Sequence, residues 1–246
     1  METCFPAGFV SVLIRQHKNR FSGDFLVELS NMEYKKSFAG LYENLKKKYG
    51  RPQGQWNLWC KRPKTKKERE EVIIGAILTQ RTNWKNVELA INNLKSAKVN
   101  SLKDIYQLGP KKLAPLINPS GFYKTKAQYL LNLTRFIIKN CGGLERILRP
   151  CSGQVEKVEL KELREELLKL KGIGPESADS ILLYALDKPI FVIDEYTRKL
   201  VKAHNLADNA DYHFLQKLFE ENLRRDYRLY QDFHALIVIN GKNSKK

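Results

Sequence analysis

The sequence is poor in cysteine. Its 246 residues contain only Cys4, Cys60, Cys141 and Cys151, and no two of them are spaced as C-x-x-C. Structural zinc sites and disulfide frameworks both need clustered or regularly spaced cysteines, so both are disfavoured. We expect four reduced thiols with structural roles.

Long apolar runs are also absent. The sequence has no uninterrupted apolar stretch of the roughly 18 residues that a membrane helix needs. Its first residues, Met1-Glu2-Thr3-Cys4, lack the basic start and long apolar core of a signal peptide. We therefore expect an intracellular protein with no membrane partner.

Acidic residues are the third deficit. The chain has 27 Asp and Glu against 44 Lys and Arg, which gives a formal net charge of +17. Such an excess favours a polyanionic partner such as nucleic acid, and a basic soluble protein without that role is the alternative. An apolar content of 42% supports a substantial core, and the length allows one large or two small domains.

The most informative feature that is present is a glycine-bearing loop followed by a helical pattern. Residues 170–174 read LKGIG, and Gly172 and Gly174 can adopt backbone angles closed to other residues. Pro175 suits the first position of a helix, and the apolar residues behind it recur at helical spacing. The unpaired amides at that helix start favour an anion such as phosphate. From the loop alone, a tight interhelical turn is an equally good interpretation.

A carboxylate follows an apolar run further along the chain. Phe191-Val192-Ile193 leads directly into Asp194. Such a carboxylate can stabilise a developing positive charge, and it can orient or deprotonate a water molecule. The next residues, EYTRKLVKAH, are helical in pattern, so Asp194 is also a good helix N-cap. Local sequence alone favours the cap, and the two roles are compatible.

The rest of the chain reads as consecutive amphipathic helices. One helix ends at Gly50 and is followed by a basic connector over residues 51–71. Further helices are expected at about 71–80, 84–96, 101–107, 110–117, 123–140, 159–170, 176–186, 195–204, 211–224 and 227–240. The sequence therefore predicts an all-α fold. Residues 1–31 have strand-like or mixed patterning, and we expect a short β or irregular extension there.

Three segments resemble the endonuclease III superfamily of DNA glycosylases, the helix-hairpin-helix and Gly/Pro-Asp (HhH-GPD) proteins. The loop 170–174, Ala178 and Asp194 match its hairpin, its small packing residue and its aspartate. Residues 75–84, GAILTQRTNW, resemble its first core helix and the following turn, and residues 119–127, PSGFYKTKA, resemble its middle GxYxxKA segment. The three motifs occur in the family's order over roughly residues 40–236.

This resemblance implies two helical lobes of the HhH-GPD type with a cleft between them. The first is a six-helix domain over 70–189 that contains the helix-hairpin-helix at about 159–186. The second is formed by both chain ends, from residues 32–69 and 190–246. Substrate would lie in the cleft, with the hairpin and Asp194 near its mouth.

In this superfamily the residue just after the hairpin decides the type of reaction. Bifunctional members place a lysine at the position of Glu176, where it attacks the sugar and forms a Schiff base, which a carboxylate cannot do. The resemblance therefore implies a monofunctional glycosylase, closest to the 3-methyladenine DNA glycosylase branch, with Asp194 and Glu176 as its candidate catalytic residues. For Glu176, an acid favoured by the helix dipole is an equally good interpretation.

Aromatic side chains form the base pocket in that branch. Trp84 falls where the family stacks an aromatic ring on the flipped base, and Trp56 or Trp59 is expected to cover the other face. Ring faces attract cations, which suits a cationic alkylated purine. Simple packing at a domain junction is the alternative for each tryptophan. The family's double-tryptophan pattern is only partly present, and Leu236 stands where a close relative carries a pocket lysine.

The resemblance also implies contacts with DNA. Gln80 would hydrogen-bond the orphaned base, although a polar helix end is an equally simple interpretation. The other expected DNA contacts are Gly172, Ile173, Gly174, Arg81, Lys124, Lys126 and Lys171. A solvated charge remains the default for any single lysine.

The expected cofactor content is small. Many endonuclease III relatives carry a cysteine-ligated iron–sulfur cluster after the aspartate, and we expect no iron–sulfur cluster here because no cysteine follows Asp194. As in relatives, the hairpin carbonyls of Leu170 and Gly172 are expected to hold a structural sodium or potassium ion. No other metal or cofactor is expected.

The sequence therefore predicts a base-excision repair enzyme. Its expected partner is double-stranded DNA containing a damaged base, with alkylated purines such as 3-methyladenine favoured. We expect a monomer in the cytoplasm of a prokaryote, associated with the nucleoid. One alternative is an endonuclease III-like glycosylase and AP lyase for oxidised or mismatched bases. The other is a non-catalytic DNA-binding module.

Overall fold

The computed structural model describes residues 37–149 and 153–244, and the expected extension over 1–31 lies outside the described residues. Within the described ranges every regular element is helical, as expected for an all-α fold, and no strand occurs. None of the described helices combines the length and the apolar character needed to cross a bilayer.

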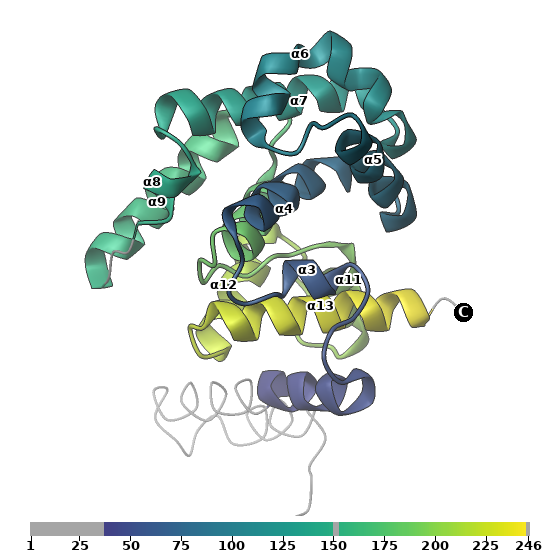
Figure 1. The fold of residues 1–246 in the computed structure, drawn as a ribbon. Coiled ribbons are helices and arrows are strands. Elements are labelled where there is room, and N and C mark those ends of the chain that lie inside the picture. Colours follow the sequence, from purple (N-terminus) through teal and green to yellow (C-terminus); the bar gives the residue numbers. More distant parts are fainter. Residues whose placement is uncertain (1–36, 150–152, 245–246) are drawn as a thin grey trace, which may run out of the picture.

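The helices form two groups, one above the other in Figure 1. The upper group holds α5, α6, α7, α8 and α9, and the buried helix α4 leads into it from below. Its elements are α4 (Lys66–Leu78), α5 (Trp84–Ser96), α6 (Leu102–Leu116), α7 (Tyr123–Arg135) with a π-helical turn (Phe136–Asn140), α8 (Leu144–Ile147) and α9 (Gly153–Lys169). The hairpin continues into α10 (Pro175–Ser180) and a second π-helical turn (Ile181–Ala185).

Both ends of the described chain contribute to the lower group. Its elements are a helix over 37–49, α3 (Trp56–Trp59), α11 (Glu195–Ala203), α12 (Tyr212–Asn222) and α13 (Tyr227–Asn243). In Figure 1 the helix over 37–49 lies below α13, so segments nearly 200 residues apart in sequence share one group. Aromatic rings hold this group together: Phe219 meets Phe38 at 4.7 Å and stacks on Phe191 at 4.3 Å between ring centroids.

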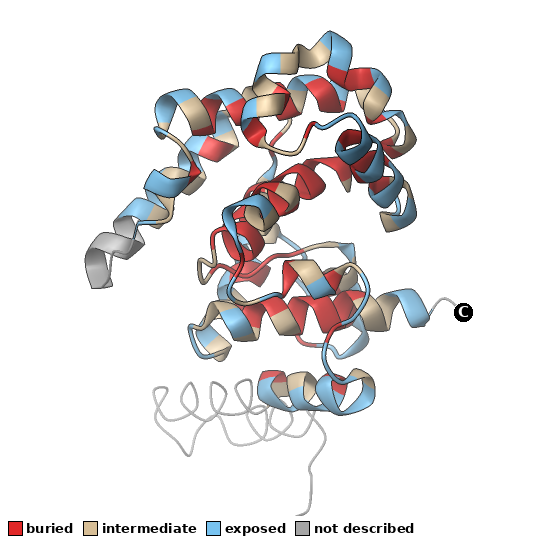
Figure 2. Ribbon diagram, in the orientation of Figure 1, coloured by how far each residue is buried: buried red, intermediate tan, exposed pale blue. Residues whose placement is uncertain are grey.

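Helix α4 forms the centre of the molecule, and it begins earlier than its pattern predicts. The Thr65 side chain accepts from the Glu68 N–H, while the Glu68 carboxylate accepts from the Thr65 N–H, so a capping box starts the helix at Lys66. The expected connector over 51–71 is therefore wrong at both α3 and the first turn of α4. The second half of α4, Val72–Leu78, is buried throughout, as the red band in Figure 2 shows.

A buried carboxylate joins the hairpin to the lower group. Asp179 is fully buried and receives a bidentate bond from Arg164, at 2.7 and 2.9 Å. It also accepts from the Tyr212 hydroxyl at 2.8 Å and from the Gln216 amide at 2.7 Å. The same Gln216 amide donates to the Phe191 carbonyl at 2.7 Å. Because a buried charge must be fully paired, this network fixes the segment that leads into Asp194.

Candidate active site

One cavity, of about 310 Å³, brings most of the predicted chemistry together. It lies where α3, the turn after α4, α10, α11 and α13 meet. Its lining includes Gln55, Trp56, Trp59, Thr82, Trp84, Glu176, Asp194, Tyr196, His234 and Lys242. Residues from both groups of helices therefore face a single space, which fits the expected cleft between lobes.

Asp194 has two oxygens in different environments. Oδ1 accepts from the Thr197 N–H at 2.7 Å and from the Thr197 hydroxyl at 2.9 Å, so Asp194 is the N-cap of α11. Oδ2 lies 3.6 Å from Nε2 of His234, which is longer than a hydrogen bond. The cap fixes the side chain and leaves Oδ2 on the cavity side, so capping and chemistry are compatible.

The surroundings keep Asp194 ionised. Burial alone would raise its pKa, since its side chain is only 13% exposed. The nearby imidazole of His234 and the hydrogen bonds from Thr197 outweigh burial and lower the pKa of Asp194 below its usual value. A carboxylate that is anionic at neutral pH is what electrostatic stabilisation of a positive sugar requires.

The structure places the predicted tryptophans around this cavity, in unequal roles. Trp84, at the start of α5, is half-buried, whereas Trp56 and Trp59 are each 4% exposed. Trp59 packs edge-on against Trp84 at 6.0 Å and edge-on against Trp56 at 5.8 Å. Trp84 therefore has the accessible ring surface, while Trp56 and Trp59 form the packed wall behind it.

Glu176 and Lys242 place opposite charges at the rim of the cavity. Glu176 lies in the first turn of α10 and is exposed, and partial burial together with the charge of Asp194 raises its pKa. Because its surface reaches solvent, we expect this shift to be small. Lys242, near the end of α13, donates to Gln55 Oε1 at 3.2 Å. No sequence motif marks Lys242, because only folding brings α13 beside α3.

The hairpin turn depends on a glycine with no room for a side chain. Gly172 has φ +94°, and a Cβ there would lie 2.2 Å from the ring of Tyr129. Gly174 serves as the N-cap of α10, whose first turn has no side-chain cap. The N–H of Ile173 donates back to the Leu170 carbonyl at 3.0 Å, and the Ile173 side chain is buried. Of the three loop residues expected at DNA, Gly172, Ile173 and Gly174, Gly174 is the most exposed. Ile173 has a buried side chain, and its N–H is hydrogen-bonded inside the protein.

Gln80 joins the hairpin to the turn after α4. Its amide Nε2 donates to the Gly172 carbonyl and to the Ser177 hydroxyl, both at 2.9 Å. The resemblance predicts that this amide faces an orphaned base, but both of its protons are used inside the protein. Gln80 positions the hairpin here, and its expected contact with a base stays a prediction.

Lys126 is the clear correction among the expected phosphate contacts. It is 2% exposed, and its Nζ donates to the Leu78 carbonyl at 2.8 Å and to the Ser120 carbonyl at 2.7 Å. Burial lowers the pKa of Lys126 to about 8. The ammonium therefore ties the end of α4 to the loop before α7, and no phosphate can reach it. Lysine in a GxYxxKA pattern gives no local sign of burial, because the burial comes from tertiary packing.

Three exposed side chains lie next to the two segments that Lys126 joins. Arg81 and Phe122 follow these segments, and Lys124 lies in the first turn of α7; all three are exposed, as is Lys171 in the hairpin. Phe122 is 64% exposed and has a left-handed backbone, with φ +46°. An aromatic side chain held outward in a strained conformation is typical of a functional position. Sequence reasoning overlooks Phe122, because its exposure is a property of the folded loop.

No cation site can be assigned at the hairpin. The Leu170 carbonyl accepts from Ile173 N–H, and the Gly172 carbonyl accepts from Gln80. Each carbonyl keeps a second lone pair, so the expected sodium or potassium ion stays a prediction. Over residues 37–149 and 153–244, no group of three or more His, Cys, Asp or Glu side chains is placed to hold a metal.

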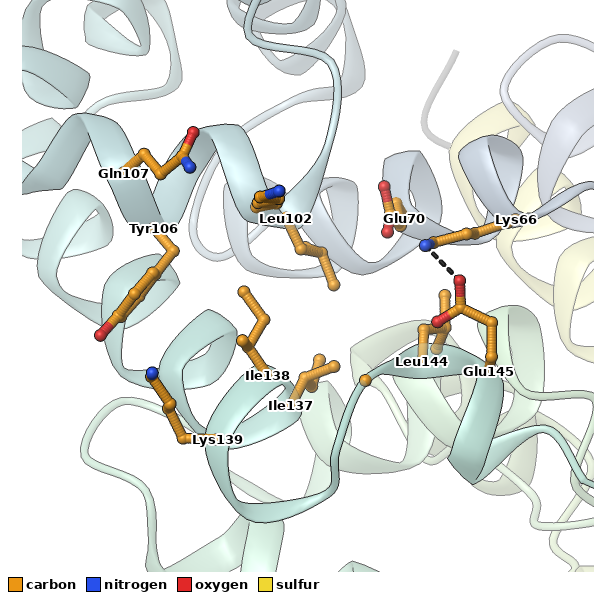
Figure 3. A pocket seen from close by; sticks show the side chains of 12 residues that line it. Lys66, Glu70, Leu102, Tyr106, Gln107, Ile137, Ile138, Lys139, Leu144 and Glu145 are labelled. Atoms are coloured by element: carbon orange, nitrogen blue, oxygen red, sulfur yellow. Dashed lines mark ion pairs between the residues drawn. The ribbon is translucent and has the colours of Figure 1, made fainter.

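A second hollow, of about 350 Å³, lies away from this site between α4, α6 and α8 (Figure 3). Its apolar lining comes from Leu102, Ile137 and Leu144, among others. The carboxylate of Glu70 is 6% exposed and accepts from the N–H of Leu102, and Lys66 pairs with Glu145 at the rim. Its buried carboxylate is thus engaged with backbone, and its other lining charges, Lys103 and Lys139, are exposed, so this hollow lacks the buried carboxylate–imidazole pair of the Asp194 cavity.

The sequence is similar to a known family and to several known proteins. Residues 74–225 match the HhH-GPD superfamily base excision DNA repair proteins. A proposed DNA repair glycosylase of Methanocaldococcus jannaschii is 45% identical over 175 residues, which cover 71% of this chain and 77% of that protein. Endonuclease III of Thermotoga maritima is 27% identical over 169 residues, covering 65% of this chain and 71% of that protein.

Solved structures show the same fold. The crystal structure of the H. pylori 3-methyladenine DNA glycosylase bound to 1,N6-ethenoadenine has a TM-score of 0.68 and 30% identity, over 86% of this chain and 98% of that chain. A trapped endonuclease III–DNA covalent intermediate has a TM-score of 0.64 at 17% identity, over 86% and 88% of the two chains. The chain therefore belongs to the HhH-GPD superfamily of base excision DNA repair proteins and is an endonuclease III-like DNA glycosylase.

Proposed function

We propose that this DNA glycosylase is monofunctional and hydrolyses the N-glycosidic bond of an alkylated purine, such as 3-methyladenine, in double-stranded DNA. The observation that carries the proposal is the cavity that joins Asp194 to Trp84, with Glu176 in the hairpin helix. Oδ2 of Asp194 accepts no hydrogen bond of normal length from the described residues, so it is available to a sugar or a water. Glu176 cannot form a Schiff base, which favours direct hydrolysis.

The reaction follows from these positions. The flipped base enters the cavity beside Trp84, and its sugar faces Oδ2 of Asp194. As the glycosidic bond lengthens, positive charge develops on the sugar, and the adjacent carboxylate stabilises it. Water then adds to the anomeric carbon and leaves an abasic site. The hydrogen bonds from Thr197 hold Oδ1 in place throughout, so the carboxylate needs no reorganisation.

The lining of the cavity favours an alkylated purine. Asp194 and Glu176 contribute two carboxyl groups against the single ammonium of Lys242, so the local field attracts a positively charged base. The ring face of Trp84 attracts cations as well. The likeness to the H. pylori 3-methyladenine DNA glycosylase supports the same class of substrate. An alkylated cationic base leaves without prior protonation, so no strong general acid is needed.

We assign extrusion of the nucleotide to the exposed surface around Phe122. We assign Phe122 to the gap in the base stack, because apolar side chains inserted between base steps kink DNA and unstack it. Arg81 and Lys124, both exposed, are assigned to the flanking phosphates. Gly174 and the uncapped start of α10 are assigned to a phosphate of the damaged strand.

A panel of duplex oligonucleotides tests this function. Each duplex carries one lesion: 3-methyladenine, 1,N6-ethenoadenine, 8-oxoguanine or a mismatched thymine. Released base and strand breaks are scored separately. We expect base release from the alkylated purines, with strand breaks only after alkali. Strand cleavage without alkali on oxidised or mismatched duplexes would contradict the proposal, and binding without base release from any duplex would favour a non-catalytic module.

A second candidate function is AP lyase activity through Lys242. This lysine lines the same cavity as Asp194, and partial burial lowers its pKa, which increases the fraction of neutral, nucleophilic amine. Borohydride reduction in the presence of abasic DNA would trap a covalent adduct if Lys242 attacks the sugar. An adduct formed by the wild-type protein and lost in Lys242→Gln would establish this function.

A further inference from the structure

His234 is buried beside the catalytic carboxylate and has an unused polar atom. The side chain is on α13, is 4% exposed, and lines the Asp194 cavity. Its Nδ1 lies 2.7 Å from the hydroxyl of Tyr184, which is fully buried. Its Nε2 has no hydrogen-bond partner among the described residues. A buried polar atom without a partner is costly, so its place in a reaction cavity calls for a functional explanation.

The distance between Nε2 and Asp194 identifies what the unused atom faces. The separation from Oδ2 is 3.6 Å, too long for a direct hydrogen bond, so neither atom satisfies the other. Oδ1 is already occupied by Thr197. The two uncommitted atoms, Oδ2 and Nε2, therefore border the same part of the cavity.

The ring is held in place by its neighbours. Trp56 packs edge-on against it at 6.0 Å, and Phe191 does so at 6.3 Å between centroids. The Tyr184 hydroxyl has one proton and two acceptors within reach, Nδ1 of His234 at 2.7 Å and the Gln231 carbonyl at 3.3 Å. Donation to the nearer atom, Nδ1, leaves the neutral imidazole with its own proton on Nε2, on the side of the carboxylate. We take this tautomer, in which Nε2 is the donor in the cavity.

We propose that His234 is a positioning residue that holds the attacking water against Asp194, with Nε2–H donating to the water oxygen and Oδ2 accepting one of its protons. The inference rests on the proposed hydrolytic function and adds a residue to its mechanism. Tyr184 acts through His234 by fixing the orientation of the imidazole.

The step balances without another reactant. The bond between the anomeric carbon and the base nitrogen breaks, and its electron pair leaves with the base, which departs neutral if it was an alkylated cation. The water oxygen forms the new bond to carbon, and its proton passes to Oδ2 and then to solvent. His234 keeps its proton throughout and serves as a donor only.

The charged groups around this pair come from several elements. α10 contributes Glu176 and α13 contributes Lys242, each of which interacts with Asp194, while Glu195 and Arg198 of α11 act on Glu176. His234 is the foremost neighbour that lowers the pKa of Asp194. The Nε2–H dipole of a neutral imidazole also favours the ionised carboxylate, so loss of the imidazole raises the pKa of Asp194. Protonation of Asp194 should then slow base release at a higher pH than in wild type.

The test compares His234→Leu, His234→Gln and the matched control His204→Gln under single-turnover conditions. His204 is exposed at the end of α11, so its variant should behave as wild type. For His234→Leu we expect a roughly 100-fold loss of base-release rate. Affinity for DNA with an abasic-site analogue should be unchanged, and the acidic limb of the pH–rate profile should shift to higher pH. His234→Gln keeps an N–H donor and should recover part of the rate.

The outcomes separate this inference from the proposed function. A wild-type protein that releases no base from any lesion refutes the function itself. If the wild type is active, the role of His234 is overturned when His234→Leu leaves either the base-release rate or the acidic limb unchanged. It is also overturned when His234→Gln releases base no faster than His234→Leu. Thermal unfolding is recorded for each variant. If His234→Leu does not fold, Tyr184→Phe takes its place. We expect a smaller loss of base-release rate in this variant, and an unchanged rate would overturn the inference.

Discussion

The two hollows of this protein differ little in size and greatly in chemistry. The Asp194 cavity measures about 310 Å³ and the hollow beside Glu70 about 350 Å³. In the larger one, Glu70 accepts from the start of α6 and Lys66 pairs with Glu145. In the smaller one, Oδ2 of Asp194 and Nε2 of His234 make no hydrogen bond of normal length within the described part of the chain. Buried polar atoms without a partner, more than volume, distinguish a reaction site from a packing gap.

The largest expected effect comes from exchanging the carboxylate in each hollow. Asp194→Asn keeps the shape of the side chain but removes its charge, so base release should fall by about 10³-fold, within the range for a lost catalytic group. The matched variant Glu70→Gln should release base at the wild-type rate. Single-turnover release of radiolabelled base measures both, and equal rates in the two variants would remove the distinction between the hollows.

The hairpin allows a second comparison, between its two glycines. Gly172→Ala places a Cβ against Tyr129 at a left-handed φ and should cost about 1–3 kcal/mol of folding stability. Gly174→Ala has open space and an ordinary backbone, so its stability should be close to wild type. Urea unfolding measures both free energies. An undisturbed Gly172→Ala would show that the turn does not pack on Tyr129.

Lys126 and Lys124 of α7 allow a comparison between a buried lysine that binds backbone carbonyls and an exposed lysine expected to contact DNA. Lys126→Met leaves the Leu78 and Ser120 carbonyls unpaired and should lower stability by about 1–3 kcal/mol. Lys124→Met should leave stability unchanged and reduce the salt dependence of DNA binding by about one phosphate contact. Thermal unfolding and salt titrations of affinity measure the two effects. If Lys126→Met changed the salt dependence of DNA binding and Lys124→Met lowered stability, Lys126 would be a DNA contact after all.

The pH dependence of stability follows from the same buried lysine. Its pKa in the fold, about 8, lies below the ordinary lysine value. The unfolded chain therefore binds more protons between these two values, so this group makes the folded state more stable as pH rises above about 8. Urea unfolding of wild type and Lys126→Met from neutral to alkaline pH tests this. The contribution should vanish in the variant, and an identical slope in both would contradict it.

The smallest effect is expected from chelation. Because no metal-binding group is found among the described residues, EDTA should leave the base-release rate unchanged. Metal analysis of the purified protein accompanies the rate measurement. A rate that falls with EDTA and returns with added metal would contradict the expectation.

Local patterns predict the helices well because each buries one apolar face at a spacing of 3.6 residues. The predicted ranges 84–96 and 195–204 lie within one residue of α5 and α11. The start of α4 could also have been predicted, since Thr65-Lys66-Lys67-Glu68 is a capping-box pattern hidden in a basic run. Motif resemblance supplied Asp194, Trp84 and the hairpin.

Other members of the site could not be found in this way. His234 and Lys242 reach the cavity because α13 crosses beneath α3 and α11, and a packing arrangement of this kind has no signature in local sequence. Lys126 shows the opposite error, since a lysine is expected at the surface unless the fold encloses it. The exposure of Phe122 likewise depends on how the loop before α7 is tied to α4.

The most direct test of the central claim is a crystal structure of Asp194→Asn bound to duplex DNA that carries an alkylated purine on a 2′-fluorinated sugar, which resists hydrolysis. We predict that the base lies beside Trp84 in the smaller cavity, with the anomeric carbon facing the side chain of residue 194 and Phe122 in the gap of the stack. A base that remains stacked in the duplex, or that occupies the hollow beside Glu70, would contradict the assignment of the site.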